Sequence, residues 1–137
     1  MTIKRWTPSL IGPPVGQYSH LAMAPANRDM LFIAGQVGTL PDGSLAGLDA
    51  EAQSRQIHDN IEALLRSAGG SPADLVKIFT MVAGSEHVAG TRAGRIEHFA
   101  RWFPGGDWPT QSLIVVSALA APEIVVEVEA IAAIPSR

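Results

Sequence analysis

The sequence predicts a single α+β domain that spans residues 1–137. Its length is typical of one domain with a proper hydrophobic core. Apolar β-branched runs and amphipathic helical stretches follow one another in the order β-β-β-α-β-α-β-β. The chain closes with two apolar runs, residues 113–119 and 124–134, that a Pro-containing turn separates. These features predict a mixed sheet with two helices on one face, in which the last two strands are neighbours.

The other expected strands are short and end at turn-forming residues. They cover residues 3–6, 18–24, 30–34 and 75–83. Gly35 and Gln36 follow the third of these strands, and residues 41–43 (Pro-Asp-Gly) form a strong turn signal. We therefore expect a short β-rich half before the first helix.

Two helices are expected, one in each half of the chain. Asp49 can cap a helix that runs to about residue 68, because apolar side chains recur there with a period of 3.6 residues. Ser85 can cap a second helix through about residue 103. Gly90 and Gly94 each weaken that helix by about 1 kcal/mol relative to Ala. Its arginines, Arg92 and Arg95, are expected to be solvated.

The last two strands differ in their apolar pattern. Residues 113–116 are apolar at every position, which is typical of a strand covered on both faces. Residues 124–134 alternate, so Glu127 and Glu129 share a face with Val125 and Ile131. Two helices cover only one face of such a sheet. We expect a second copy of the chain to cover the other face and to lie near the two glutamates.

Composition excludes several classes of function. The formal charge of -3, from 10 basic and 13 acidic residues, disfavours nucleic-acid binding. The absence of cysteine excludes disulfides and thiolate catalysis, and it is consistent with a reducing cytoplasm. Three glutamates and Pro122 interrupt the longest apolar stretch, so no membrane span is expected. The four histidines lack ligand spacing, and neither a metal nor another cofactor is expected.

Four residues offer chemistry, and each has a structural alternative. Glu127 and Glu129 lie roughly 6–7 Å apart along a strand, which suits one of them to proton transfer. Both could instead be solvated or paired with arginine. Gln111 carries two donors and one acceptor at a strand start, or is an ordinary surface residue. Tyr18, the sole tyrosine, either presents its hydroxyl to a ligand or is a half-buried aromatic residue.

Several short blocks together resemble the Rid family, the reactive-intermediate deaminases also called YjgF or L-PSP proteins. The blocks are residues 16–20 (GQYSH), 31–36 (LFIAGQ), 68–78 (AGGSPADLVKI), 109–112 (PTQS) and 126–132 (VEVEAIA), with Asn60 in the first helix. Each block alone is weak, but their order and spacing are specific. The resemblance implies a chorismate-mutase-like fold, a homotrimer, and small-molecule clefts between subunits.

The resemblance also assigns site residues. A glutamate of the last strand, which holds the attacking water in deaminating members, corresponds to Glu127. The tyrosine near the N-terminus corresponds to Tyr18, and the Gly-Gln turn corresponds to Gly35 and Gln36. The arginine that clamps the substrate carboxylate corresponds to Gln111, and this is the main departure from the family pattern.

The departure at Gln111 changes the expected ligand. A charge-assisted clamp contributes roughly 1.5–3 kcal/mol, and glutamine offers only a neutral hydrogen bond. Ala34 and Leu113 also replace residues that are often serine and cysteine. We therefore expect no standard 2-imino acid deaminase, but a trimer that binds a carbonyl or imine metabolite and hydrolyses an imine or enamine. A non-catalytic metabolite-binding or protein-interaction trimer is the alternative, and the charge disfavours a ribonuclease.

Overall fold

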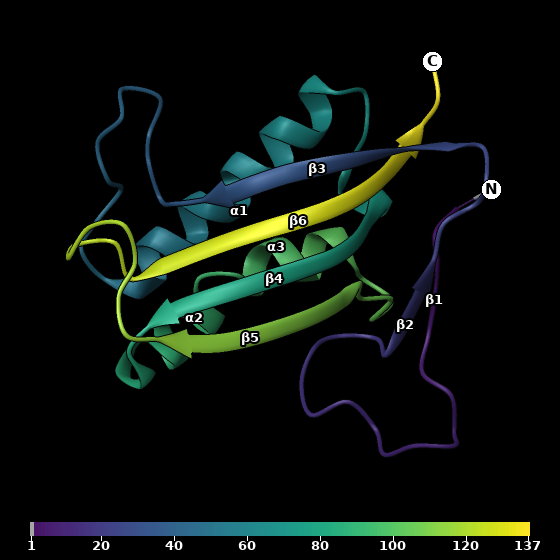
Figure 1. Ribbon diagram of the computed structural model, residues 1–137, viewed down its shortest axis with the longest axis horizontal. Coiled ribbons are helices and arrows are strands. Elements are labelled where there is room, and N and C mark those ends of the chain that lie inside the picture. The colour runs from purple at the N-terminus through teal and green to yellow at the C-terminus, as the bar shows by residue number, and fades with distance from the viewer. Residues whose placement is uncertain (1) are drawn as a thin grey trace.

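The computed structural model describes residues 2–137 and has the predicted α+β architecture (Figure 1). The strands are β1 (Lys4–Trp6), β2 (Leu21–Met23), β3 (Arg28–Gln36), β4 (Leu75–Ala83), β5 (Thr110–Val116) and β6 (Val126–Pro135). The helices are α1 (Ala50–Ser67), α2 (Val88–Ala93) and α3 (Ile96–Trp102), with 3-10 turns at Pro72–Asp74 and Ser85–His87. The α+β prediction is therefore confirmed.

Four strands form one mixed sheet in the order β3-β6-β4-β5. β4 and β5 are parallel, and the other two pairings are antiparallel. The expectation that the last two strands are neighbours is wrong, because β4 lies between them. The parallel β4–β5 pair needs a long crossover, which the α2–α3 segment supplies. β1 and β2 form a separate two-stranded sheet at one end (Figure 1).

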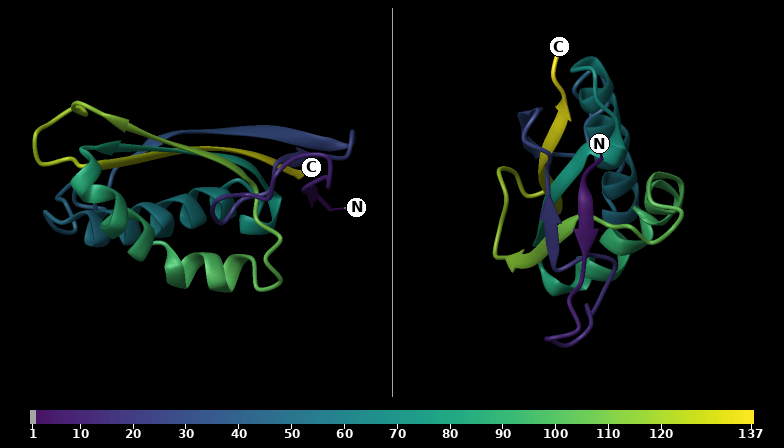
Figure 2. Two further views of the ribbon diagram at one scale, coloured as in Figure 1. Left: turned by 90° about the horizontal axis from the view of Figure 1, so that it is seen from below. Right: turned by 90° about the vertical axis from the view of Figure 1, so that its right-hand side faces the viewer.

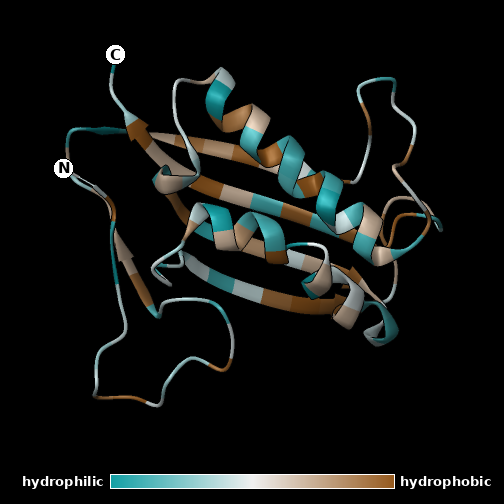
Figure 3. Cartoon of the chain, turned by 180° about the vertical axis from the view of Figure 1, so that it is seen from behind, coloured by the Kyte–Doolittle hydropathy of each residue, from teal (hydrophilic) through white to brown (hydrophobic). Residues whose placement is uncertain are grey.

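The helices lie together on one face of this sheet (Figure 2). The predicted cap of α1 is present, since the Asp49 carboxylate accepts the Ala52 N–H at 3.0 Å. Apolar and polar residues alternate along α1 (Figure 3), and Ile57 and Ile61 are fully buried in the core against β6. The predicted periodicity therefore locates the helix and the main core correctly.

The expected second helix is broken into a 3-10 turn, α2 and α3, with the last break at Gly94. The two glycines of this segment face α1. A Cβ on Gly90 would lie 3.1 Å from the Ala50 Cβ, and one on Gly94 would lie 2.6 Å from the Ser54 Cβ. Ser54 Oγ also donates to the Thr91 carbonyl at 2.7 Å. The glycines therefore allow α2 and its junction with α3 to pack closely against α1.

No element of residues 2–137 covers the other face of the sheet (Figure 2). Phe32 on this face is 73% exposed and Ile114 is 42% exposed. Glu127 and Glu129 lie on the same face, as the alternation predicts, while Val126 and Val128 are fully buried under the helices. Among the described residues, no helix has the length and apolarity that a membrane span requires.

Candidate functional site

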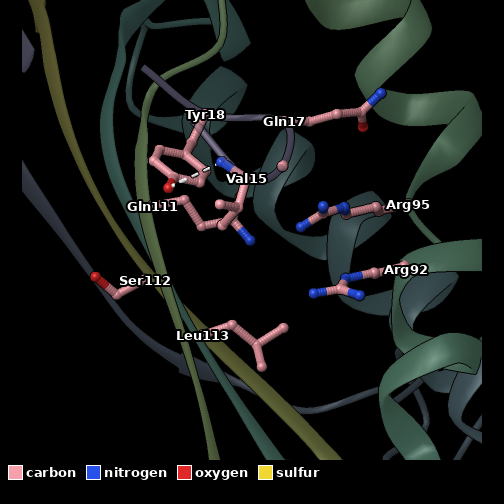
Figure 4. A pocket seen from close by; sticks show the side chains of 9 residues that line it. Val15, Gln17, Tyr18, Arg92, Arg95, Gln111, Ser112 and Leu113 are labelled. Atoms are coloured by element: carbon pink, nitrogen blue, oxygen red, sulfur yellow. Dashed lines mark hydrogen bonds between the residues drawn. The ribbon is translucent and has the colours of Figure 1, made fainter. Parts of the chain in front are cut away.

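Tyr18 and Gln111 line one cavity of about 480 Å³ between the N-terminal loop, β5 and the junction of α2 with α3 (Figure 4). The Ser19 N–H donates to the Pro109 carbonyl at 3.2 Å and ties this loop to the segment just before β5. The Tyr18 hydroxyl accepts the Val15 N–H at 3.3 Å. Two residues far apart in sequence are thus held on one cavity wall.

The Gln111 side chain lines this cavity and includes an unsatisfied acceptor. Its Oε1 atom is buried and has no hydrogen-bond partner within residues 2–137. Buried polar atoms in native proteins nearly always have a partner, so an exception needs an explanation. Leu113, two residues along β5, points to the same side as Gln111 (Figure 4). The wall therefore combines an apolar surface with an amide side chain whose oxygen is buried and unpaired.

Two arginines, Arg92 and Arg95, extend toward Gln111 from the opposite wall of the cavity (Figure 4). The expectation that both are solvated is wrong for Arg95, which is only 7% exposed, although Arg92 is exposed. Arg95 Cζ lies 4.8 Å from the centroid of the Phe99 ring. The sequence contained a signal for this burial, because Arg95 lies four residues before the core residue Phe99.

The positive charge of Arg95 has no negative partner among the described residues. Its guanidinium makes no hydrogen bond or ion pair with any described residue. Burial, and then the positive charge of Arg92, lower the pKa of Arg95 to about 10. The cavity wall therefore carries two positive charges without a compensating carboxylate in the described part of the chain.

The remaining predicted site residues, Gly35, Gln36 and Glu127, lie together elsewhere. The β3–β6 pairing is irregular between Ile33 and Gln36, and Gly35 sits in this bulge. The Glu127 carboxylate packs directly on Gly35, where any Cβ would overlap with it. Gln36 Nε2 donates to the Ala34 carbonyl at 3.0 Å. Within residues 2–137 the Glu127 carboxylate accepts no hydrogen bond, so it is available to a water or a ligand.

Strand register places these two groups on opposite faces of the sheet. Gln111 pairs with Ile78, which is buried under the helices. Glu127 pairs with Met81, and Met81 pairs with Ile114 on the uncovered face. Side chains three positions apart on one strand point to opposite faces, as Gln111 and Ile114 do. A ligand at Gln111 cannot therefore reach Glu127 of the same chain.

Glu129 lies two residues further along the uncovered face. It borders a small cavity of about 70 Å³ together with Lys77 and Phe79. The described residues include no group of three or more His, Asp or Glu side chains arranged to hold a metal ion.

Known proteins that are similar to this chain belong to one family. The family model described as endoribonuclease L-PSP matches residues 11–134. A RutC family protein of Pyrococcus horikoshii is 33% identical over 87% of this chain and 88% of its own. A 2-iminobutanoate/2-iminopropanoate deaminase of Escherichia coli is 29% identical over 76% and 79% of the two chains.

A solved structure of a Rid family protein of unknown function from Yersinia pestis is similar throughout. It has 34% identity and a TM-score of 0.82, and the match covers 98% of this chain and all of the other. The family match over most of the chain agrees with the resemblance of its short sequence blocks. On this evidence the chain belongs to the Rid family, whose members are also described as L-PSP proteins.

Proposed function

We propose that this chain forms a homotrimer that binds a small carbonyl- or imine-type metabolite in clefts between subunits. One observation carries the proposal. Tyr18 and Gln111 lie on the helix side of the sheet, and Gly35 and Glu127 lie on its uncovered side. A second copy packed on the uncovered face brings the two halves into one cleft. The exposed Phe32 supports burial of that face.

In this cleft we propose hydrolysis of an imine or enamine. Glu127 holds a water molecule and takes its proton while the water oxygen attacks the imine carbon. The C=N electron pair moves to nitrogen, which takes a proton. The C–N bond of the resulting carbinolamine then breaks and releases ammonia and a carbonyl compound. Imine and water give carbonyl and ammonia, so the reaction balances without a cofactor. The similarity to the Escherichia coli 2-iminobutanoate/2-iminopropanoate deaminase supports this reaction class.

The proposed substrate is not a simple 2-imino acid. Such a substrate carries its carboxylate next to the reacting carbon, and the sequence resemblance implies that Gln111 takes the position of the clamping arginine. The same feature favours a second candidate, a trimer that binds a metabolite or a protein without turning the ligand over. Binding without ammonia release distinguishes this second candidate from the first.

Ammonia release from a panel of imines, which an amino-acid oxidase generates in situ, tests the reaction. We expect turnover of at least one imine and slow turnover of 2-iminopropionate. Glu127→Gln should lower the rate at least about 100-fold, which is the usual contribution of a general base. Glu129→Gln, on the same face, is the matched control and should retain activity. Equal activity of wild type and Glu127→Gln would refute the role of Glu127.

Sedimentation equilibrium tests the assembly. We expect a particle of three times the 14.5 kDa chain mass. Phe32→Glu places a charge on the uncovered face and should dissociate the particle. Leu48→Glu is the matched control, because Leu48 is 76% exposed and lies outside the sheet. A monomeric wild type at micromolar concentration would contradict both the trimer and the shared cleft.

A further inference from the structure

We infer that Arg92 and Arg95 form an anion-binding site, which holds a carboxylate or phosphate group of the ligand opposite Gln111. The inference names the ligand class of the cleft described above and to that extent rests on the proposed function. It does not require that the cleft be catalytic.

The first argument is the state of Arg95 itself. A guanidinium has five N–H donors, and a buried charge is costly unless it is paired and hydrogen-bonded. Arg95 is 7% exposed, and its described surroundings offer only the face of Phe99. These donors border the cavity shared with Gln111. A bound anion supplies the missing acceptor and the missing charge together.

The second argument is the contrast with the other arginines of the chain. Five of them form ion pairs with acidic side chains of the same chain, namely Arg5, Arg28, Arg55, Arg66 and Arg101. Arg92 and Arg95 form none within residues 2–137 and share one cavity wall. Of the other arginines, only the terminal Arg137 also lacks an ion pair among the described residues, and it does not line this cavity.

The third argument is that the fold forces the two charges together. Gly94, at the break between α2 and α3, packs closely on Ser54 of α1. Arg92 and Arg95 flank this break, three residues apart, and both reach into the cavity (Figure 4). Like charges held close repel one another. An anion placed between the two guanidinium groups is attracted by both and offsets their mutual repulsion.

Gln111 adds a requirement for the neutral part of the ligand. The Gln111 amide lines the cavity opposite the arginines, so the ligand should also carry a polar group, such as a hydroxyl, that can hydrogen-bond to it. The replacement of arginine by Gln111 therefore does not remove positive charge from the cleft. The positive charge comes instead from the opposite wall, at Arg92 and Arg95.

Calorimetric titration with a charged and neutral pair of ligands tests the inference. The pair is 4-hydroxybutanoate and 4-hydroxybutanamide, which differ chiefly in charge and share the hydroxyl donor. We expect wild type to bind the carboxylate at least tenfold more tightly than the amide. Inorganic phosphate is a third probe. Tighter binding of phosphate than of the carboxylate would favour a phosphate ester as the ligand class, and weaker binding would favour a carboxylate.

Variants locate the binding to the two arginines. Arg92→Met and Arg95→Met should each lower the affinity for the preferred anion by tenfold or more. Arg55→Met is the matched control, because it removes the same charge from an exposed ion pair on α1, and it should change affinity less than twofold. Arg92 is exposed, so its variant remains a valid test even if Arg95→Met fails to fold.

Two results overturn the inference. One is equal affinity of wild type for the carboxylate and the amide, which is also expected if a carboxylate of another subunit already pairs with these arginines. The other is an equal loss of affinity in Arg55→Met. Failure of the proposed function looks different. If no imine is hydrolysed but the anion preference and its loss in Arg92→Met are present, the anion site stands without the reaction. If neutral imines are hydrolysed without any anion preference, the reaction stands without the site.

Discussion

Arg5 and Arg95 are both buried arginines, and each stacks on an aromatic ring. The side chain of Arg5 is 4% exposed, and its Cζ lies 5.3 Å from the Phe103 ring centroid. Arg95 is 7% exposed and lies 4.8 Å from the Phe99 ring centroid. Arg5 donates to the carbonyls of Leu75 and Ala73, at 2.7 Å each, and to the Asp107 carboxylate at 3.0 Å. Arg95 has no such partner among the described residues.

This difference separates a structural arginine from a binding one. Arg5 of β1 joins the start of β4 to the loop before β5, and its donors are used by the chain itself. Arg95 is also buried and stacked on a ring, but its donors remain for another molecule. Burial alone does not distinguish the two residues. What distinguishes them is whether their N–H donors have acceptors within the chain. Removal of each charge in turn tests this difference.

The largest effect is expected for Arg5→Met. This variant leaves the Leu75 and Ala73 carbonyls without their donor and should lower the free energy of unfolding by about 3 kcal/mol. Urea unfolding measures the loss, and the anion affinity should stay unchanged. Arg101→Met removes an exposed ion pair and should cost less than about 1 kcal/mol. A similarly small loss in Arg5→Met would erase the distinction between the two buried arginines.

A smaller effect is expected for Gly94→Ala, which disturbs the packing of the residue before Arg95 against α1. The added methyl group would overlap with the Glu51 carbonyl and lie 2.6 Å from the Ser54 Cβ. Overpacking of this kind costs about 1–3 kcal/mol, and the shift of α2 should also weaken anion binding.

Gly105→Ala is the matched control for this variant, because no atom lies within 4 Å of its added Cβ. It should change neither stability nor affinity. Lower stability of Gly94→Ala with full anion affinity would show that this contact does not position the arginines.

The sequence predicted features that depend on local pattern. The cap at Asp49 and the alternation of β6 need only neighbours along the chain, and both are present. The β5–β6 adjacency was wrong because strand order depends on the path of the whole crossover. Gly94 was read as a weak helix residue because its contact with α1 cannot be seen in sequence.

The candidate site, like the strand order, depends on long-range arrangement that the sequence predicts only in part. Tyr18 and Gln111 share a cavity, as expected of one site, but Glu127 faces the other side of the sheet. That separation follows from strand register, which the sequence does not reveal. The burial of Arg95 differs from the expected solvation for a different reason. Arginine is usually solvated, and its burial depends on the break between α2 and α3.

Arg95→Met should change stability less than either of the first two variants. Removal of an unpaired buried charge relieves its desolvation cost, and the methionine side chain can still pack on Phe99. In the absence of ligand, the free energy of unfolding should change by less than about 1 kcal/mol. A loss near that of Arg5→Met, in urea unfolding of the two variants side by side, would mean that Arg95 has a structural partner in the assembled protein.

The smallest expected effect is on His58, a fully buried residue close enough to Arg95 to sense its charge. Burial, followed by the charges of His98 and Arg95, lowers the pKa of His58 to about 4, although the hydrogen bond from Nδ1–H to the Ser54 carbonyl and the nearby Asp59 oppose the shift. The folded pKa lies below the ordinary value of 6.5, so the unfolded chain binds more protons between these limits. Neutral His58 therefore stabilises the fold fully above pH 6.5, and this stabilisation is lost as the pH falls toward about 4.

Removal or neutralisation of the Arg95 charge should raise the pKa of His58. NMR titration of the His58 ring should show this rise in Arg95→Met, and also in wild type saturated with the preferred anion. The free energy of unfolding of Arg95→Met should then fall less between pH 6.5 and pH 4 than that of wild type. The reason is that the pKa of His58 in the folded variant lies closer to its value in the unfolded chain. Arg55→Met, which removes an equal charge from the exposed side of α1, should leave the titration unchanged. If the anion leaves the His58 pKa unchanged while Arg95→Met raises it, the anion binds away from Arg95, and the charge there is balanced by another group.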